Sequence, residues 1–151
     1  LVDDFEAEKA ARLAWYCHAD APFEADGNAL VARLDDAALA VVPLGGTPME
    51  SRPGKEIVLA GRGPGKGTPT HRGWRLERVM KSPARQARLV HLLVPIGADD
   101  DPPEAALLDS GRDAVRFRLR LPGERKRREV RVYLEDARPR PRAPGIPFPA
   151  D

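Results

Sequence analysis

The stretch DAVRFRLRLPG, residues 113–123, decides the fold class of this chain. Apolar and cationic side chains alternate strictly along it, so each kind would line one side of an extended backbone. The apolar positions are Val115, Phe117, Leu119 and Leu121. A period of two predicts a β-strand with one buried face and one solvent face.

The same alternation returns in residues 128–136, REVRVYLED, after a polar turn that opens with Pro-Gly at 122–123. Two alternating runs joined by such a turn predict a β-hairpin. A second hairpin is predicted over residues 21–34, with its turn at the Asp-Gly-Asn sequence of 26–28.

Short strands separated by glycine- and proline-containing loops predict an all-β fold, an antiparallel β-sandwich of two packed sheets with little helix. Residues 88–96, RLVHLLVPI, are apolar on both faces, as expected of a central strand that is covered on both sides. Residues 102–111, PPEAALLDSG, would form at most one or two helical turns. Further strands are expected at 1–6, 11–18, 38–43, 56–60 and 74–80, and long loops at 44–54 and 61–73.

Stacking two such sheets about 10 Å apart buries every second side chain of each strand. The predicted core consists of Leu13, Trp15, Val115, Phe117, Leu119, Val130, Val132 and Leu134.

The domain is expected to span residues 1–136 and to be truncated on its N-terminal side, because the chain opens abruptly in strand-like sequence, LVDDFEAE. Residues 137–151 are rich in proline and arginine and cannot extend a sheet. We expect them to form a tail that is extended or draped on the surface.

Composition sets limits on the class of protein. The 151 residues are 42% hydrophobic, enough for the core of one domain. A single cysteine excludes an internal disulfide, and neither an apolar run long enough for a membrane span nor a signal peptide is found. The compartment therefore stays open between periplasm and cytoplasm. The formal charge of +2 conceals an acidic first 30 residues and a cationic stretch at 112–142, which would either meet an anionic polymer or form a solvated arginine face.

The segment AGRGPGKGTPT, residues 60–70, invites comparison with a phosphate-binding loop. That loop needs a glycine five residues before Gly-Lys and a Ser or Thr after it, but Ala60 and Gly67 stand there. We reject the nucleotide hypothesis. What is left is a cationic loop with Arg62, Lys66 and Arg72, which is either simply solvated or closes over an acidic ligand.

The stretch ARLAWYCHAD, residues 11–20, gathers two aromatic residues, the cysteine and a histidine. On a strand, Trp15 would face the core and Tyr16 and His18 the opposite side, where a sugar ring could stack and form hydrogen bonds. Tyr16, His18, Arg62, Lys66 and Arg72 are therefore the candidate saccharide-binding residues. No metal-ligand spacing and no catalytic constellation is recognisable, and His91 is expected to be a hydrogen-bonded core histidine or a semi-buried one.

The order of these pieces resembles the C-terminal β-sandwich of the heparinase II/III-like polysaccharide lyases. In that family a strand that starts Val-Asp leads across an acidic turn into a strand that ends Trp-x-x-His. Here Val-Asp stands at 2–3 and Trp-Tyr-Cys-His at 15–18, and Leu-Val-Pro at 93–95 is similar to the end of a later family strand. The resemblance covers residues 1–136 and is one of pattern; no single motif in it is specific.

The resemblance implies an accessory domain that follows and supports an (α/α) toroid of the same chain. In the family the toroid carries most of the machinery that cleaves uronate-containing polysaccharides by β-elimination. None of those motifs falls within residues 1–151, so this segment alone is expected to be inactive and to hold no cofactor. The expected partners are the toroid and an anionic polysaccharide, not nucleic acid. The alternative is a non-catalytic carbohydrate-binding or protein-interaction sandwich.

Overall fold

The computed structural model describes residues 1–60 and 70–134, without the side chains of 53–55, 58–60 and 70–72. The described residues are folded entirely as β-strands and connections, and they contain no helix that could cross a membrane. The strands are β1 (Val2–Ala11), β2 (Ala14–Ala19), β3 (Phe23–Asp26), β4 (Ala29–Arg33), β5 (Ala37–Gly46), β6 (Met49–Ala60), β7 (Thr70–Met80), β8 (Ala84–Gly97), β9 (Glu104–Ser110), β10 (Ala114–Arg120) and β11 (Arg128–Tyr133).

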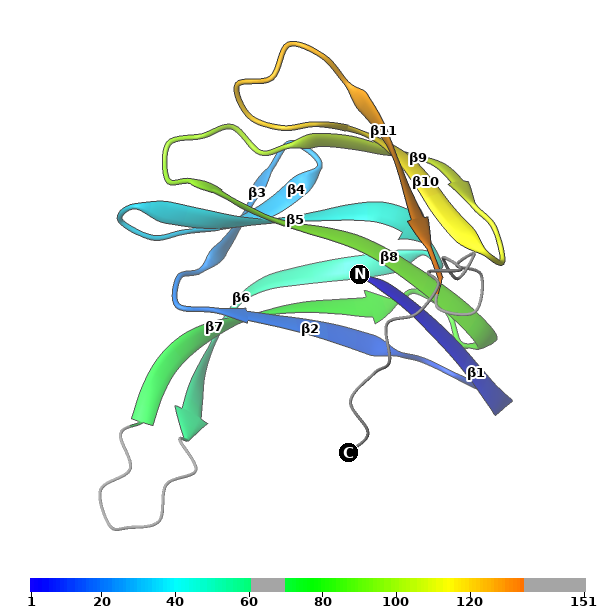
Figure 1. The fold of residues 1–151 in the computed structure, drawn as a ribbon. Helices are drawn as coiled ribbons and strands as arrows, with labels where there is room; N and C mark the ends of the chain where they lie inside the picture. The colour runs from blue at the N-terminus through cyan, green and yellow to red at the C-terminus, as the bar shows by residue number, and fades with distance from the viewer. Residues whose placement is uncertain (61–69, 135–151) are drawn as a thin grey trace, which may run out of the picture.

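These strands form three antiparallel sheets (Figure 1). The central sheet has the order β1-β8-β5-β4-β3, the lower sheet β2-β7-β6 and the upper sheet β11-β10-β9. The predicted all-β antiparallel sandwich is confirmed, and so is the central position of the apolar run at 88–96, which lies in β8 between β1 and β5.

Strand β4 shows how the central sheet is buried on both faces. Ala29 and Val31 point to one side and pack toward the upper sheet, where Ala105 of β9 joins their cluster. Leu30 and Ala32 point to the other side and pack toward the lower sheet. Because these four side chains of β4 are buried on alternate faces, the sandwich has three layers instead of the expected two.

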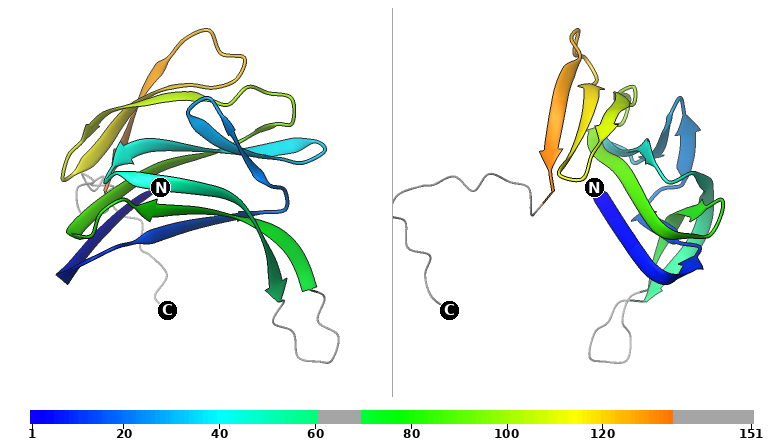
Figure 2. Two further views of the ribbon diagram at one scale, coloured as in Figure 1. Left: turned by 180° about the vertical axis from the view of Figure 1, so that it is seen from behind. Right: turned by 90° about the vertical axis from the view of Figure 1, so that its right-hand side faces the viewer.

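The lower sheet continues the central sheet around a corner. Strands β1, β8 and β5 pass into β2, β7 and β6, in the same lateral order on both sides of the bend. Both views of Figure 2 show the strands turning there. Backbone hydrogen bonds continue across the bend, from Met80 N to Leu13 O at 2.9 Å and from Lys81 N to Pro48 O at 3.1 Å.

Gly46 allows β5 to bend. Its φ of +95° lies in a region that side chains rarely adopt, and a Cβ built there would lie 2.1 Å from the carbonyl oxygen of Arg88. The register between β5 and β8 shifts between Pro43 and Gly45, which marks a β-bulge. Bulges increase the local twist of a strand, so the bulge and the glycine together turn β5 toward the lower sheet.

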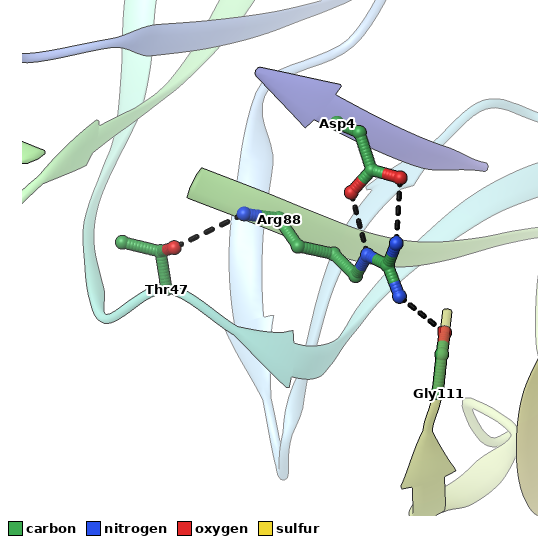
Figure 3. Close-up of polar contacts among 4 residues, drawn as sticks. All are labelled: Asp4, Thr47, Arg88 and Gly111. Carbon is green, nitrogen blue, oxygen red and sulfur yellow. Dashed lines mark hydrogen bonds and ion pairs between the residues drawn. The ribbon is translucent and has the colours of Figure 1, made fainter. Parts of the chain in front are cut away.

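Arg88 ties all three sheets together at this corner (Figure 3). Its backbone carbonyl accepts from Thr47 N at 2.8 Å and its N–H donates to the Thr47 hydroxyl at 3.2 Å. Its guanidinium makes a bidentate pair with Asp4 of β1, at 2.5 and 2.7 Å, and donates to the carbonyl of Gly111 between β9 and β10. The hydrogen bonds from Arg88 lower the pKa of the Asp4 carboxyl group.

Two local predictions were wrong. The expected loop at 44–54 lies almost entirely in β5 and β6, because bulges take up its glycines and prolines without ending the strands. The segment at 102–111 forms strand β9 and no helical turn. Pairing with β10 and the partial burial of its inward side chains outweigh the helix propensity of Glu, Ala and Leu there. Of the expected loop at 61–73, residues 61–69 lie outside the described residues and Thr70 begins β7.

The core predicted from the alternating hairpin is largely confirmed. Val115 and Phe117 are buried, and Leu119 and Val130 pack against them. Burying side chains of this size contributes about 1.5–3 kcal/mol each.

The remaining predicted core positions differ in burial. Trp15 packs into the layer between the central and lower sheets, whereas Leu13 and Leu134 are half-buried. The prediction for Val132 was wrong, since its side chain is 40% exposed. The physical reason is that β11 is the edge strand of the upper sheet, where Val132 lines an open groove.

Replacing Gly46 tests whether the corner depends on it. We expect Gly46→Ala to lower the free energy of unfolding by more than about 2 kcal/mol, because strain and a backbone clash act together. Gly27→Ala is the matched control: φ is +60° and nothing lies within 4 Å of the added Cβ, so about 1 kcal/mol is expected. Denaturant unfolding measures both, and equal losses would contradict the role of Gly46.

Candidate functional site

Strand β2 separates its side chains as the alternation predicted. Trp15 and Cys17 pack against the core, while Tyr16 and His18 are exposed on the outer face of the lower sheet. The Tyr16 side chain is 46% exposed, which is high for an aromatic residue in the middle of a strand. Burial raises the pKa of the Cys17 thiol, which packs against the core as a neutral side chain.

The neighbouring strand β7 completes a polar group around Tyr16. The register places Glu77 opposite Tyr16 and Arg75 opposite His18, so all four side chains share the outer face. The Tyr16 hydroxyl donates to Glu77 Oε1 at 3.2 Å, and the guanidinium carbon of Arg75 lies 5.0 Å from the centre of the Tyr16 ring. We call these four residues the Tyr16 face.

Arg75 leaves a positive charge uncompensated on this face. Its guanidinium rests on the Tyr16 ring and forms no ion pair with any carboxylate among the described residues. An aromatic ring beside a guanidinium, with a histidine and a carboxylate as hydrogen-bonding neighbours, can hold a sugar ring and pair with its carboxylate. A single face of one sheet therefore offers both apolar contact and charge recognition.

The five candidate binding residues have different outcomes. The structure brings Tyr16 and His18 together on one face. Arg62 and Lys66 lie outside the described residues, and Arg72 lies in β7 opposite Val58, with its side chain outside the described part of the chain. The role of these three cations stays a prediction.

The sequence reasoning missed Arg75 and Glu77. The signal was present in WRLERV, residues 74–79, where Arg75 and Glu77 alternate with Trp74 and Leu76. Their place beside Tyr16 depends on the pairing of β2 with β7, about 60 residues apart in sequence, which periodicity cannot show.

A buried polar cluster lies on the inner side of the same strands. The His91 ring of β8 stacks on Trp15 with a centroid distance of 4.2 Å. Arg78 of β7 donates from Nη1 to His91 Nε2 at 2.6 Å and from Nε to the Ser51 hydroxyl at 3.1 Å. Arg78 and His91 are only 8% and 2% exposed, so the cluster joins the central and lower sheets from within.

The cluster keeps His91 neutral. Burial lowers the pKa of His91 to about 4, and the positive charge of Arg78 acts in the same direction. The expected hydrogen-bonded core histidine is thus confirmed on one side only. Nε2 accepts from Arg78, whereas Nδ1 is buried and has no hydrogen-bond partner among the described residues.

The described residues contain no group of three or more His, Cys, Asp or Glu side chains arranged to hold a metal ion. Their chemistry on the Tyr16 face is that of recognition: stacking, hydrogen bonding and charge pairing.

The buried His91 predicts a pH dependence of stability. In the unfolded chain His91 titrates near 6.5, whereas in the folded chain its pKa is about 4. As the pH falls through this window, only the unfolded state gains the proton, so folding loses up to about 3 kcal/mol. Denaturant unfolding at several pH values should show this loss. His91→Gln should flatten it, while the exposed control His18→Gln should keep it; an unchanged slope in His91→Gln would refute the assignment.

Comparisons of this chain with models of protein families, with curated proteins and with solved structures find no match. Its function must therefore be argued from the residues that the fold brings together. Those are the Tyr16 face and the arginines of the upper sheet.

Proposed function

We propose that this chain is a non-catalytic accessory β-sandwich of a heparinase II/III-like polysaccharide lyase, and that it binds a uronate-containing polysaccharide. The observation that carries the proposal is the Tyr16 face. A half-exposed aromatic ring lies under a guanidinium that has no carboxylate partner among the described residues, on the strand whose Trp-Tyr-Cys-His sequence carries the family resemblance. Uronates combine an apolar ring face with a carboxylate, and the Tyr16 face offers a partner for each.

An apolar groove fits the supporting role of such a domain. It has a volume of about 370 Å³ and lies between the central and upper sheets. Most of its lining residues are apolar, while His91 and Tyr133 contribute polar atoms; Val132 and Tyr133 are 40% and 38% exposed. Exposed apolar surface of this kind is typical of packing against another domain. We propose that the catalytic toroid of the parent protein packs here.

The alternative proposal is a protein-interaction sandwich that has no saccharide ligand. The same groove supports it, because an apolar surface can pack against a different protein as well as against a toroid of the same chain. The reading frame upstream of Leu1 discriminates between the two. A helical toroid with tyrosine and histidine acid–base residues supports the lyase proposal, and an unrelated domain supports the alternative.

Mutation of the Tyr16 face tests the binding proposal. We expect Tyr16→Ala/Arg75→Gln to weaken binding of heparan sulfate or alginate tetrasaccharides about tenfold, because stacking and charge pairing are lost together. Tyr16→Phe should cost less, since it removes only the hydroxyl that donates to Glu77. Calorimetric titration measures the affinities, and Arg85→Gln, an exposed arginine of β8, is the control. Equal affinities for all variants would refute the Tyr16 face as a binding site.

A second test concerns catalysis. β-Elimination needs a base at the C5 proton, an acid at the leaving oxygen and neutralisation of the uronate carboxylate, all converging on one sugar. We expect the purified chain to give no unsaturated product from heparan sulfate or alginate, measured by its ultraviolet absorbance. Turnover above that of a heat-denatured sample would contradict a non-catalytic role.

A further inference from the structure

Positive charge is concentrated in the upper sheet. Residues 104–134 carry nine cationic side chains and five carboxylates. The whole chain is nearly balanced, with 25 Lys and Arg against 23 Asp and Glu. Part of this charge is neutralised locally. Arg120 and Arg127 share the carboxylate of Glu104, and Arg128 pairs with Glu124 in the β10–β11 turn.

Three other arginines gather on the outer face of this sheet. Arg116 and Arg118 alternate with the buried side chains of β10, and Arg131 projects from β11. The register places Arg116 directly opposite Arg131 and Arg118 opposite Glu129. We call Arg116, Arg118 and Arg131 the arginine face.

Local carboxylates neutralise this face only in part. Arg116 lies 3.6 Å from Asp109 and 3.5 Å from Glu129, well beyond the 2.7–2.9 Å of a strong charge-assisted hydrogen bond. Arg118 forms no hydrogen bond or ion pair with any described residue. The guanidinium carbon of Arg131 lies 4.7 Å from the Tyr133 ring centre, and Arg131 likewise has no carboxylate partner in the described part of the chain.

This arrangement is unfavourable in the absence of an anion. Like charges directly opposite one another on neighbouring strands destabilise a sheet, and Arg116 faces Arg131 in this way. A bound anion would relieve that repulsion and occupy the unpaired Arg118. Glu129 is the one carboxylate on β11. It lies 3.5 Å from Arg116 and opposite Arg118, so it partly takes the place of such an anion.

The arginine face and the Tyr16 face lie on opposite sides of the protein. The lower sheet covers one face of the central sheet and the upper sheet covers the other, so their outer surfaces point away from each other. One short oligosaccharide cannot contact both.

We propose that the arginine face is a second, independent binding surface for acidic polysaccharide, so that one molecule of this protein bridges two polysaccharide segments. The bridging rests on the function proposed above; the binding by the arginine face does not. Guanidinium groups pair bidentately with carboxylates and sulfates, and three of them on a flat sheet suit a linear polymer with repeating anionic groups.

The same face suits single-stranded nucleic acid less well. Binding of that kind relies on aromatic rings on which bases stack, together with a cationic groove. Tyr133, whose ring lies against the Arg131 guanidinium, offers one aromatic ring beside this face, whereas a run of bases stacks on several. A polymer that needs charge and little stacking is therefore the better fit.

Charge-matched variants test the surface. Arg118→Gln/Arg131→Gln should lower the affinity for a heparan sulfate tetrasaccharide, about fivefold for each guanidinium removed, in the variant that already lacks the Tyr16 face. Arg12→Gln/Arg85→Gln removes the same charge from exposed positions elsewhere and should have little effect. If the two double variants bind equally well, the proposal is overturned. Tighter binding of oligothymidylate than of the tetrasaccharide at equal ionic strength would overturn it too, in favour of nucleic acid.

Glu129 provides a test with the opposite sign. Glu129→Gln removes the carboxylate that competes for Arg116 and should tighten tetrasaccharide binding several-fold, an outcome that general loss of structure cannot imitate. Unchanged or weaker binding would count against the proposal.

Bridging is measured by light scattering with long heparan sulfate chains. The wild type should cross-link them, and loss of either face should abolish cross-linking while leaving one tetrasaccharide bound.

If only the Tyr16 variants lose tetrasaccharide binding, the proposed function stands and the arginine face is refuted. If only the arginine-face variants lose it, the Tyr16 face is refuted. If the wild type binds no tetrasaccharide, both are refuted.

Discussion

The three sheets meet at Arg88, and the architecture depends on how closely the chain packs around it. Its carbonyl oxygen lies where a side chain on residue 46 would have to be, so β5 can pair with β8 at the bend only because a glycine stands there. Its guanidinium then reaches both Asp4 in β1 and the carbonyl of Gly111 beside the upper sheet. A bidentate pair has a defined geometry, so it fixes the relative position of these segments as well as adding energy.

Covering the central sheet on both sides restricts where function can reside. Side chains of its inner strands β4, β5 and β8 fill much of the two interlayer cores, whereas the outer faces of the lower and upper sheets are open to ligands. These faces differ in chemistry: among the described side chains, one presents a tyrosine beside the Arg75 guanidinium and the other presents three arginines on neighbouring strands. Both are built on rigid strands, so a ligand would bind without ordering a loop, which keeps the entropic cost of binding low.

Much of the fold was predictable because strand periodicity is local. Val115 and Phe117 were placed in the core by alternation alone. The errors arise where tertiary context decides: bulges carried β5 and β6 through an expected loop, and pairing with β10 made a strand of residues 104–110. Alternation also cannot tell an edge strand from a central one, which is why Val132 is exposed. Half of the Tyr16 face was missed for a similar reason, since register between distant strands is absent from local sequence.

Arginine illustrates the same limit in chemical terms. Arg88 forms a bidentate ion pair with Asp4, and Arg78 is buried against a neutral histidine. Arg118 has no partner among the described residues. Burial without a carboxylate lowers the pKa of Arg78, whereas the hydrogen bond to Asp4 raises that of Arg88. The cationic composition of the chain therefore says little by itself about anion binding. What matters is which guanidinium groups the fold has left without a carboxylate at a surface, and those are the ones on which the binding hypotheses rest.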